Sequence, residues 1–427
     1  MSQLTVQEFI DVVIRSQLVE HDQLIHVLAD CKREGQLPAD VDAVADFLCN
    51  RNVITSWQKR NLRQGKSRGF FLGNYRLLNH VGTGGMSSVF LAEHLSIKRQ
   101  VAIKVMPSSR AEDADFLSRF QREAIVTSRL SHPNVVRVFD IDEQDGTHFI
   151  VMEYVEGPDL KAIVKKQGPL RLELAAHYIA QAATGLQHAH ERGLVHRDVK
   201  PANLVVTQDD LLKVLDLGLA RVKESDAFVN ADEAGVAMMG TADYLAPEQA
   251  VDAHAVDHRA DIYSLGCTMY FLLSGHPPFP KGSIAERLEM HRTQKPRDIR
   301  AEREDCPHAI AHVCMTMLSK DPNERFAAAG MVAQRLHRWI QAHGHRFSSV
   351  TYATSENIPS IGQLQPSETL DVDLDQSGDK GSLVERREAR RKSRVKTPIW
   401  LWAALAISVI ACGVLCIYAA MRWLGGA

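Results

Sequence analysis

The sequence lacks the features that mark several classes of protein. Its seven cysteines are an odd number and include no CxxC pair, which argues against a disulfide framework and favours a reducing compartment. Lys and Arg number 50 against 52 Asp and Glu, so no excess of positive charge indicates a nucleic-acid-binding protein. The first residues show no basic stretch followed by an apolar run, and no signal peptide is predicted. The hydrophobic content of 45% excludes a wholly disordered chain.

One long apolar run is present near the end of the sequence. Residues 399–421 contain no charged side chain, and a helix of that length spans about 35 Å, against about 30 Å for the hydrocarbon core of a bilayer. Trp400, Trp402 and Trp423 lie near its two ends, where interfacial aromatic residues gather. A buried helix of a globular domain is the alternative, but such a helix seldom lacks a polar face over this length. We therefore expect one transmembrane helix over residues 399–421.

The charge around this run predicts its orientation. Residues 385–396 include seven basic and two acidic side chains, and only the short tail 422–427 follows the run. Because basic flanks stay on the cytoplasmic side, we expect a single-pass membrane protein whose folded parts lie in the cytoplasm. Membrane lipid is then a partner of the C-terminal helix. We interpret the basic cluster as a stop-transfer flank, with attraction to anionic lipid headgroups as the alternative.

Patterning divides the rest of the chain into three parts. Residues 1–65 carry apolar side chains at helical spacing and predict a helical N-terminal module, with a docking or regulatory role toward a protein partner. Residues 345–397 are mostly polar and predict a flexible linker that ends in the basic cluster. Residues 75–340 predict strands at 89–94 and 101–106 and then mostly helices. This order predicts an α+β fold, a small sheet-rich lobe and a larger helical lobe with a cleft between them.

A glycine-rich segment, VGTGGMSSV at residues 81–89, lies between two predicted strands. Its glycines lack Cβ atoms and allow backbone amides to approach phosphate oxygens, although a glycine cluster at a hairpin is more often an ordinary turn. A Rossmann motif would require a helix directly after it, and a Walker A motif would require Gly-Lys-Ser/Thr, which is absent. The candidate phosphate-binding residues are Val81, Gly82, Thr83, Gly84, Gly85, Met86, Ser87, Ser88 and Val89.

A lysine on the second predicted strand is the next candidate. Ala102 and Lys104 share one face of this strand because side chains alternate along it, and they offer a small platform for adenine and a cation for phosphates. Glu123, in a helix-like stretch nineteen residues further on, is the natural partner to hold Lys104. A lone strand lysine is more often a solvated edge residue, so this pair alone leaves both interpretations open.

A third group of motifs decides between them. The motifs are VAIK at 101–104, HRDVKPAN at 196–203, DLG at 216–218 and APE at 246–248. They occur in the order of the signature set of protein kinases. Two further landmarks are Asp261 and Arg325. Over about residues 75–340, the chain therefore resembles the Hanks-type (eukaryotic-like) serine/threonine protein kinases of the bacterial membrane-anchored type.

The resemblance implies a bilobal protein-kinase fold that binds ATP with Mg²⁺, with Mn²⁺ as the alternative ion. The glycine-rich segment would cover the ATP phosphates, and Lys104, held by Glu123, would contact the α- and β-phosphates. The hinge that bonds adenine would run from Met152, the gatekeeper, through Glu153 to Val155.

The resemblance also assigns roles in catalysis. Asp198 would orient the substrate hydroxyl and accept its proton, while Lys200 would stabilise the transferred phosphate. Asn203 and Asp216 would hold the metal ion. Lys200, with Thr241 in the segment before APE, follows the pattern of serine/threonine kinases, so the substrates would be Ser and Thr hydroxyls of proteins, the kinase itself included.

Two substitutions depart from the family pattern near the nucleotide. Ser87 occupies the third glycine position of the phosphate loop, where its Cβ would stiffen the loop tip and weaken ATP binding. Leu217 stands where the family has Phe, a conservative apolar change. We expect neither to abolish catalysis.

The activation segment, residues 216–248, departs more strongly. It has no Ser or Thr between Asp226 and Gly240, yet Arg197, which normally grips an activating phosphate, is present. Glu248 and Arg325 are the family's partners at the end of this segment. We hypothesise that Asp232 or Glu233 supplies the negative charge permanently. The alternative is that the loop is disordered and Arg197 pairs elsewhere; only the hypothesis predicts that alanine at both acids lowers the rate.

Other functions remain as alternatives to the kinase. One is a nucleotide-binding pseudokinase scaffold whose altered phosphate loop no longer supports transfer, against which stand the intact residues Lys104, Asp198, Asn203 and Asp216. Another is a small-molecule phosphotransferase of related fold. A group of metal-ligand residue types, Cys306, His308, His312 and Cys314, lacks the usual metal spacings, and we interpret it as structural.

Overall fold

The computed structural model describes residues 4–33, 40–84, 87–107, 113–217, 242–251 and 256–343. The expected linker, transmembrane helix and tail lie outside these residues. Within them, no helix combines the length and the apolar character needed to cross a bilayer.

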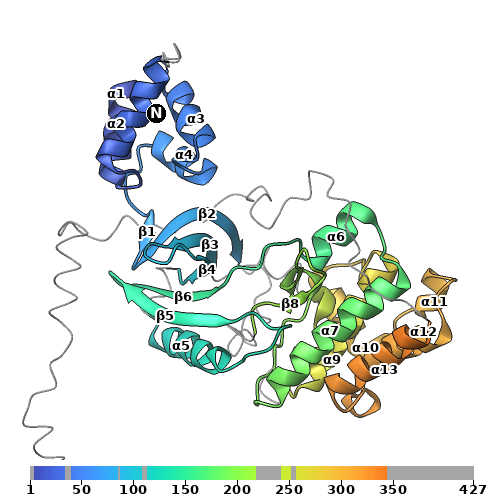
Figure 1. The fold of residues 1–427 in the computed structure, drawn as a ribbon. Coiled ribbons are helices and arrows are strands. Elements are labelled where there is room, and N and C mark those ends of the chain that lie inside the picture. Colours follow the sequence, from blue (N-terminus) through green and yellow to red (C-terminus); the bar gives the residue numbers. More distant parts are fainter. Residues whose placement is uncertain are drawn as a thin grey trace, which may run out of the picture. The chain divides into compact units, whose positions relative to one another are not determined.

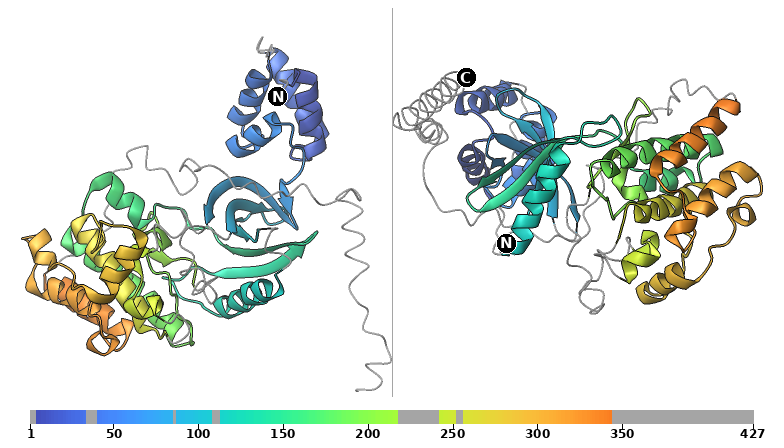
Figure 2. Two further views of the ribbon diagram at one scale, coloured as in Figure 1. Left: turned by 180° about the vertical axis from the view of Figure 1, so that it is seen from behind. Right: turned by 90° about the horizontal axis from the view of Figure 1, so that it is seen from below.

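A six-stranded antiparallel sheet, with strand order β1-β2-β3-β4-β6-β5, forms the smaller lobe (Figure 1). The strands are β1 (Phe71–Leu72), β2 (Tyr75–Gly84), β3 (Ser87–His94), β4 (Gln100–Val105), β5 (Val138–Gln144) and β6 (Thr147–Glu153). Helix α5 (Ala114–Ser128) packs against β5, as both views of Figure 2 show. Alternation along β4 sends Val101, Ile103 and Val105 into one apolar cluster and Ala102 into another cluster with α5. The predicted strands at 89–94 and 101–106 correspond to β3 and β4.

Strand β2 is irregular where it pairs with β3. The pairing skips Leu78 and Val81, so the strand carries two β-bulges before it reaches the glycine-rich segment. A bulge bends its strand and leaves the extra residue out of the ladder. The second half of β2 stays paired with β3 as far as Gly84, and the two bulges set its direction.

Helices dominate the larger lobe. They are α6 (Leu160–Gln167), α7 (Leu172–His190), α9 (Arg259–Ser274), α10 (Ile284–Thr293), α11 (Ile299–Glu302), α12 (His308–Met317) and α13 (Ala329–Ala342), with the short helices η2 (Pro201–Asn203), η4 (Ala242–Tyr244), η5 (Pro247–Ala250) and η6 (Pro322–Glu324). Helix α9 is buried on all sides: every residue from Ala260 to Leu273 is buried, and the helix packs against α7 and α12. Gly266 allows the close approach of α12, because a Cβ there would lie 2.8 Å from the Cβ of Met317. The expected fold, a sheet-rich lobe followed by a larger helical lobe, is confirmed.

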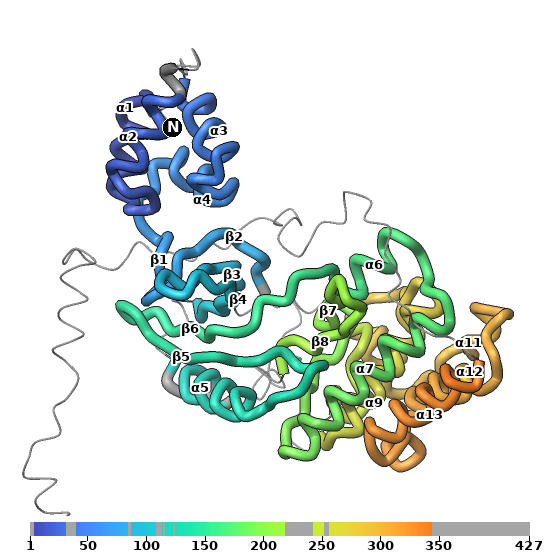
Figure 3. The backbone as a smooth tube through the Cα atoms, viewed as in Figure 1, coloured from blue at the N-terminus to red at the C-terminus, as the bar shows by residue number. Residues whose placement is uncertain are grey.

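A two-stranded ribbon of β7 (Leu204–Val206) and β8 (Leu212–Val214) lies beside α7 (Figure 3). The segments just before β7 and just after β8 carry the HRD and DLG motifs. Because the two strands pair, Leu204 opposite Val214, the ribbon brings these motifs together at one end.

Four helices precede the sheet, and we call them the N-terminal helices. They are α1 (Val6–Ser16), α2 (His21–Arg33), α3 (Val41–Asn50) and α4 (Ser56–Arg63). Thr5 and Thr55 begin α1 and α4 with capping boxes, in which the threonine and the residue three positions on satisfy each other's backbone N–H groups. The helices share one apolar cluster with Phe70, just before β1, and in it Phe9, Val13 and Leu62 are fully buried.

Candidate active site

Lys104 lies on β4, an inner strand of the sheet. The residue is 9% exposed and lies between Val89 on β3 and Ile150 on β6. Its Nζ donates a hydrogen bond to Oδ1 of Asp216 at 2.8 Å. The side chain of Glu123, the partner expected from the sequence, lies outside the described part of the structure. The structure therefore joins the lysine of the sheet to the acid of the DLG motif, 112 residues away.

Asp216 is held in an unusual backbone conformation just after β8. Its φ of 52° lies in the left-handed region, which costs energy for a residue other than glycine and often marks a functional site. Burial opposes ionisation of its carboxyl, but the charge and the hydrogen bond of Lys104, with the charges of His196 and Lys200, outweigh it and lower its pKa. Asp216 therefore stays ionised at neutral pH, and 39% of its side chain remains exposed.

Asp198, Lys200 and Asn203 form a compact polar group. Lys200 Nζ donates to Asp198 Oδ2 at 2.8 Å, and Asn203 Nδ2 donates to the Asp198 backbone oxygen at 2.8 Å and to Oδ2 at 3.2 Å. The short helix η2, which begins with Pro201, turns the chain so that the amide of Asn203 faces back toward Asp198. This arrangement fixes one carboxylate between a cation and an amide, as a group that orients a hydroxyl requires.

A buried carboxylate supports the loop that carries Asp198. Asp261 on α9 is fully buried and accepts hydrogen bonds from the backbone N–H groups of His196, at 2.8 Å, and Arg197, at 2.7 Å. The ring nitrogen Nε2 of His190 donates to the same carboxylate at 2.8 Å. Burial alone would raise the pKa of Asp261, but these hydrogen bonds and the two histidines lower it. The sequence marked Asp261 only as a landmark; its three donors could not be read from spacing.

The hinge candidates lie at the end of β6 and just after it. Met152 lies opposite Ala102 in the sheet, and both are nearly buried. The carboxylate of Glu153, the next residue, forms an ion pair with Lys213 at 2.8 Å. Val155 packs in a small cluster with Val205, a residue that the sequence analysis did not single out, although it stands in the apolar run after Asn203. Ala102 from the sheet and Val205 from the helical lobe are thus the small apolar groups near the hinge.

The glycine-rich segment is a hairpin between β2 and β3. Gly82 pairs with Val89, Thr83 with Ser88 and Gly84 with Ser87, while residues 85 and 86 lie outside the described part. Among the described residues, no heavy atom lies within 4 Å of where a Cβ on Gly82 would be, so packing against them does not require glycine there. This absence of a packing reason favours a role in backbone approach to a ligand. Ser87 is 9% exposed at the start of β3.

A cavity of about 360 Å³ is present on the other side of the hinge, in the part of the chain that the structure describes. It is lined by Arg99, Ser131, His132, Pro133, Val135, Arg137, Phe139, Glu153 and Lys213. Glu153 is the only candidate residue among them, and none of the charged residues of the Lys104 and Asp198 groups reaches it. We therefore do not take this cavity as the active site.

Oxygen ligands suited to a hard divalent cation are present on two candidate residues. Asp216 offers an ionised carboxylate. Asn203 uses its Nδ2 for both hydrogen bonds to Asp198, which leaves its amide oxygen for a ligand. Carboxylate and amide oxygens are the protein ligands that Mg²⁺ prefers, so these residues fit the ion that the resemblance implies. Elsewhere among the described residues no cluster of His, Cys, Asp and Glu could hold a metal, and Cys314 on α12 is fully buried.

The activation segment is described only at its end. Residues 218–241, with Thr241, Asp232 and Glu233, lie outside the described part, so the hypothesis about the two acids stays a prediction. Arg197 has a φ of 63°, and its backbone oxygen accepts a hydrogen bond from Gln249 Nε2 at 3.0 Å. Gln249, on η5, was another residue that the sequence did not indicate.

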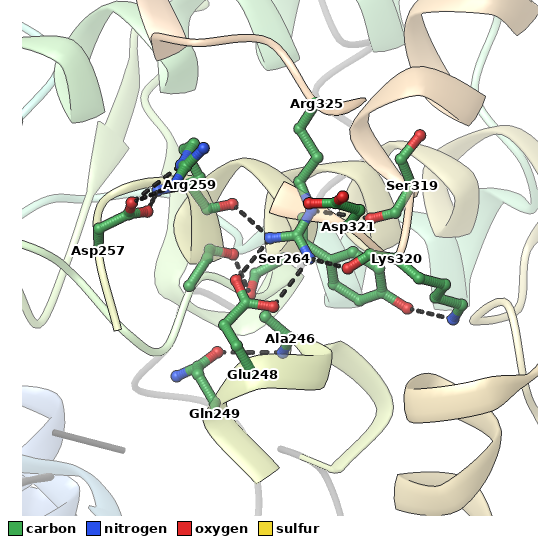
Figure 4. A network of polar contacts seen from close by, with 12 residues as sticks. Ala246, Glu248, Gln249, Asp257, Arg259, Ser264, Ser319, Lys320, Asp321 and Arg325 are labelled. Carbon is green, nitrogen blue, oxygen red and sulfur yellow. Dashed lines mark hydrogen bonds and ion pairs between the residues drawn. The ribbon is translucent and has the colours of Figure 1, made fainter. Parts of the chain in front are cut away.

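Arg325 and Glu248, the last residue of this segment, form a bidentate ion pair (Figure 4), with distances of 2.6 and 2.8 Å. The other donors of the guanidinium bond the backbone oxygens of Ser319, Arg259 and Lys320, at 2.8 to 3.0 Å. All five N–H groups of Arg325 are therefore used, and its side chain is completely buried. The pair links the APE motif to the start of α9 and to the segment before η6.

A buried polar group lies next to this pair. Tyr263 receives a hydrogen bond from Lys320 Nζ at 2.9 Å, and its hydroxyl lies 2.9 Å from His291 Nδ1. Burial and the charge of Lys320 lower the pKa of His291 to about 3, and burial lowers the pKa of Lys320 to about 8. His291 is therefore neutral in the folded protein at all pH values above about 3.

This histidine predicts a loss of stability in acid. The unfolded chain protonates His291 below about pH 6.5 while the folded protein does not, so protons favour the unfolded state. The free energy of unfolding should fall by up to about 1.4 kcal/mol per pH unit as pH decreases from 6.5. Urea denaturation at pH 7.5, 6 and 5 measures this slope, which should be shallower in His291→Phe and unchanged in the exposed-site control His312→Gln. An equal slope in all three proteins would contradict the assignment.

Comparison with known proteins identifies a family and relatives that this chain resembles. Residues 75–340 match the protein kinase domain family. The chain is 31% identical over 339 residues to serine/threonine-protein kinase PrkC of Bacillus subtilis, covering 79% of this chain and 51% of the relative. It is 38% identical over 268 residues to serine/threonine-protein kinase PknB of Mycolicibacterium smegmatis, covering 62% of this chain and 42% of the relative. The chain thus spans about half of the length of these relatives or less.

A solved structure is similar as well. The crystal structure of the PknI kinase domain of Mycobacterium tuberculosis shares 30% sequence identity with this chain at a TM-score of 0.50. The similarity covers 63% of this chain and 98% of that one. The match over nearly the whole of a kinase domain agrees with the two-lobed fold described above.

Proposed function

Because the chain belongs to the protein kinase family, we propose that it is a serine/threonine protein kinase that transfers the γ-phosphate of ATP to Ser and Thr hydroxyls of proteins, itself included. The observation that carries this proposal is the group of Asp198, Lys200 and Asn203 beside the ion pair of Lys104 and Asp216. These residues supply the base, the two lysine cations and the two metal ligands that phosphate transfer uses in this family.

Each of these residues has a distinct task in the proposed reaction. Asp198 orients the substrate hydroxyl and takes its proton as the new O–P bond forms. Lys200, already beside Asp198, places positive charge where the transferred phosphate gains negative charge. Lys104 supplies a cation for the non-transferred phosphates. Asp216 and Asn203 would hold Mg²⁺, which would supply further charge neutralisation on the nucleotide.

Two features support Ser and Thr rather than Tyr as the acceptor. Lys200 stands two residues after Asp198, and both named relatives are serine/threonine kinases. Incubation of the full chain with radiolabelled ATP and Mg²⁺, followed by phosphoamino-acid analysis, tests the proposal. Label on serine or threonine is expected. A chain that binds ATP without transferring label would instead be the pseudokinase scaffold, with Ser87 in the phosphate loop as the first suspect.

We further propose that residues 399–421 anchor the protein in a membrane, with the kinase domain in the cytoplasm. The apolar run and the basic flank at 385–396 support this proposal. The full chain should sediment with membranes and resist extraction by alkaline carbonate, because an integral helix is held by apolar contact rather than by charge. Deletion of residues 399–427 should release it. A full chain that carbonate extracts completely would overturn the proposal.

A further inference from the structure

The outer edge of β2 is only partly covered by another strand. Strand β1 has two residues and pairs with Tyr75 and Arg76 alone. Beyond it, the backbone N–H of Leu77 donates to the oxygen of Phe70 at 2.8 Å. An edge whose backbone groups lack partners is free to move and to pair wrongly, so its remaining carbonyls need other donors.

Side chains of helix α4 supply these donors. Gln58 is 2% exposed, and its Nε2 donates to the backbone oxygen of Leu77 at 2.7 Å. The hydroxyl of Thr55 donates to the backbone oxygen of Leu78, the residue at the first bulge of β2. Both side chains also form the capping box of α4, with Thr55 N–H donating to Gln58 Oε1 at 2.8 Å. The start of α4 and the bulge of β2 are therefore one hydrogen-bonded unit.

Aromatic contacts also join α4 to the segment before β1 and to β3. The ring of Trp57 meets the rings of Phe70 and Phe90 edge to face, each at 5.7 Å between centroids. Phe90 in turn meets His80 on β2 at 5.1 Å. Trp57 also packs against the apolar cluster on its side of the sheet. Contacts of this kind contribute beyond their buried area and restrict the relative movement of the rings.

The chain of contacts ends at the phosphate loop. His80 Nε2 lies 3.1 Å from Oγ1 of Thr83, which stands between Gly82 and Gly84. Burial and the charge of Arg60 on α4 lower the pKa of His80, so the ring is neutral at pH 7 and can accept the hydroxyl hydrogen. From Trp57 to Thr83, every step of this path is a described contact.

We propose that the N-terminal helices brace β2 and thereby position the phosphate loop, with Gln58, Thr55 and Trp57 as positioning residues for ATP. The inference rests on the proposed function in so far as ATP is the ligand of the loop. A brace at the bulge limits how far the second half of β2 can swing. Loss of the brace should therefore weaken ATP binding and leave the Asp198 group intact.

Gln58→Glu tests the brace with little effect on helix α4. The carboxylate keeps the acceptor for the N–H of Thr55, and glutamate is a preferred residue at this place in a capping box. It removes the donor to Leu77 and places negative charge beside that oxygen. We expect the KM for ATP of the full chain to rise about fivefold or more, with kcat changed by less than about twofold. Trp57→Leu, which removes the ring contacts by another route, should act in the same direction.

The matched control lies on the same helix. Within the described part of the chain, the side chain of Lys59 pairs with Asp46 of α3, at 2.6 Å, and not with the sheet, so Lys59→Ala should leave the KM for ATP unchanged. A KM that stays at the wild-type value in both Gln58→Glu and Trp57→Leu would overturn the proposal. A fall in kcat without a change in KM would do so as well, because it would indicate an effect on the catalytic group rather than on the loop.

Hydrogen exchange tests the brace without catalysis. In Gln58→Glu, the amides of residues 79–84 should exchange faster than in the wild type, while those of α7 should not change. Unchanged exchange at residues 79–84 would overturn the brace even if the protein is an active kinase. Faster exchange in a protein that transfers no phosphate would keep the brace and refute the proposed function, so the two failures can be told apart.

Discussion

Replacing Asp198 with asparagine is expected to lower the rate of phosphate transfer at least about 100-fold, while nucleotide binding persists. The change is nearly isosteric, so Lys200 and Asn203 can remain in place around the side chain. An amide cannot take the proton of the substrate hydroxyl, and Lys200 loses the carboxylate that now holds it at 2.8 Å. Transfer of label from ATP, with nucleotide affinity measured in parallel, separates the loss of chemistry from a loss of binding.

The control for this variant is Asp209→Asn, an exposed acid in the turn between β7 and β8. It carries the same change in charge on the same segment and should leave the rate unaltered. If Asp198→Asn retained more than about a tenth of the wild-type rate, another group would have to accept the proton, and the assigned role of Asp198 would be wrong.

Arg325→Ala is expected to have the largest effect on stability. It removes five hydrogen bonds at once and leaves the Glu248 carboxylate and three backbone oxygens without their donor. Breaking one partner of a buried ion pair typically costs about 3–5 kcal/mol. For a domain of this size, that loss lowers the melting temperature by about 10 °C. Thermal unfolding in the presence and absence of denaturant measures this shift in melting temperature.

A surface ion pair gives the matched comparison. Arg292 and Glu289 on α10 also form hydrogen bonds of 2.9 and 3.0 Å, but both side chains are 54% exposed. Arg292→Ala should change the free energy of unfolding by less than about 0.5 kcal/mol. Arg325→Lys should recover only part of the loss, because an ammonium group cannot reproduce the planar fork of donors. Equal effects at Arg325 and Arg292 would show that burial does not decide the contribution of these pairs.

Local patterns predicted the sheet-rich lobe well. The alternation that placed Ala102 and Lys104 on one face of a strand needs no knowledge of the rest of the fold, and β4 has this arrangement. The motifs likewise named Asp198, Lys200 and Asn203, whose contacts span only five residues of sequence. Short-range order of this kind follows from backbone geometry.

Contacts between distant segments could not be predicted in the same way. The ion pair of Lys104 with Asp216 crosses 112 residues, and the support of Asp261 for the loop of Asp198 crosses about 65. These pairs depend on how the ribbon of β7 and β8 and the helix α9 pack, which no spacing encodes. Gln58 is the clearest case, because an ordinary polar residue in a helix gives no sign that its amide bonds a strand 19 residues away.

The hydrogen bond from Gln58 to Leu77 also bears on where the cooperative unit of this protein begins. The family match starts at residue 75, but Leu77 has two of its backbone partners, Phe70 and Gln58, before that point. A chain cut at Tyr75 would expose the apolar ring of Phe90 and leave the edge of β2 open. The N-terminal helices and the sheet should therefore unfold in one transition.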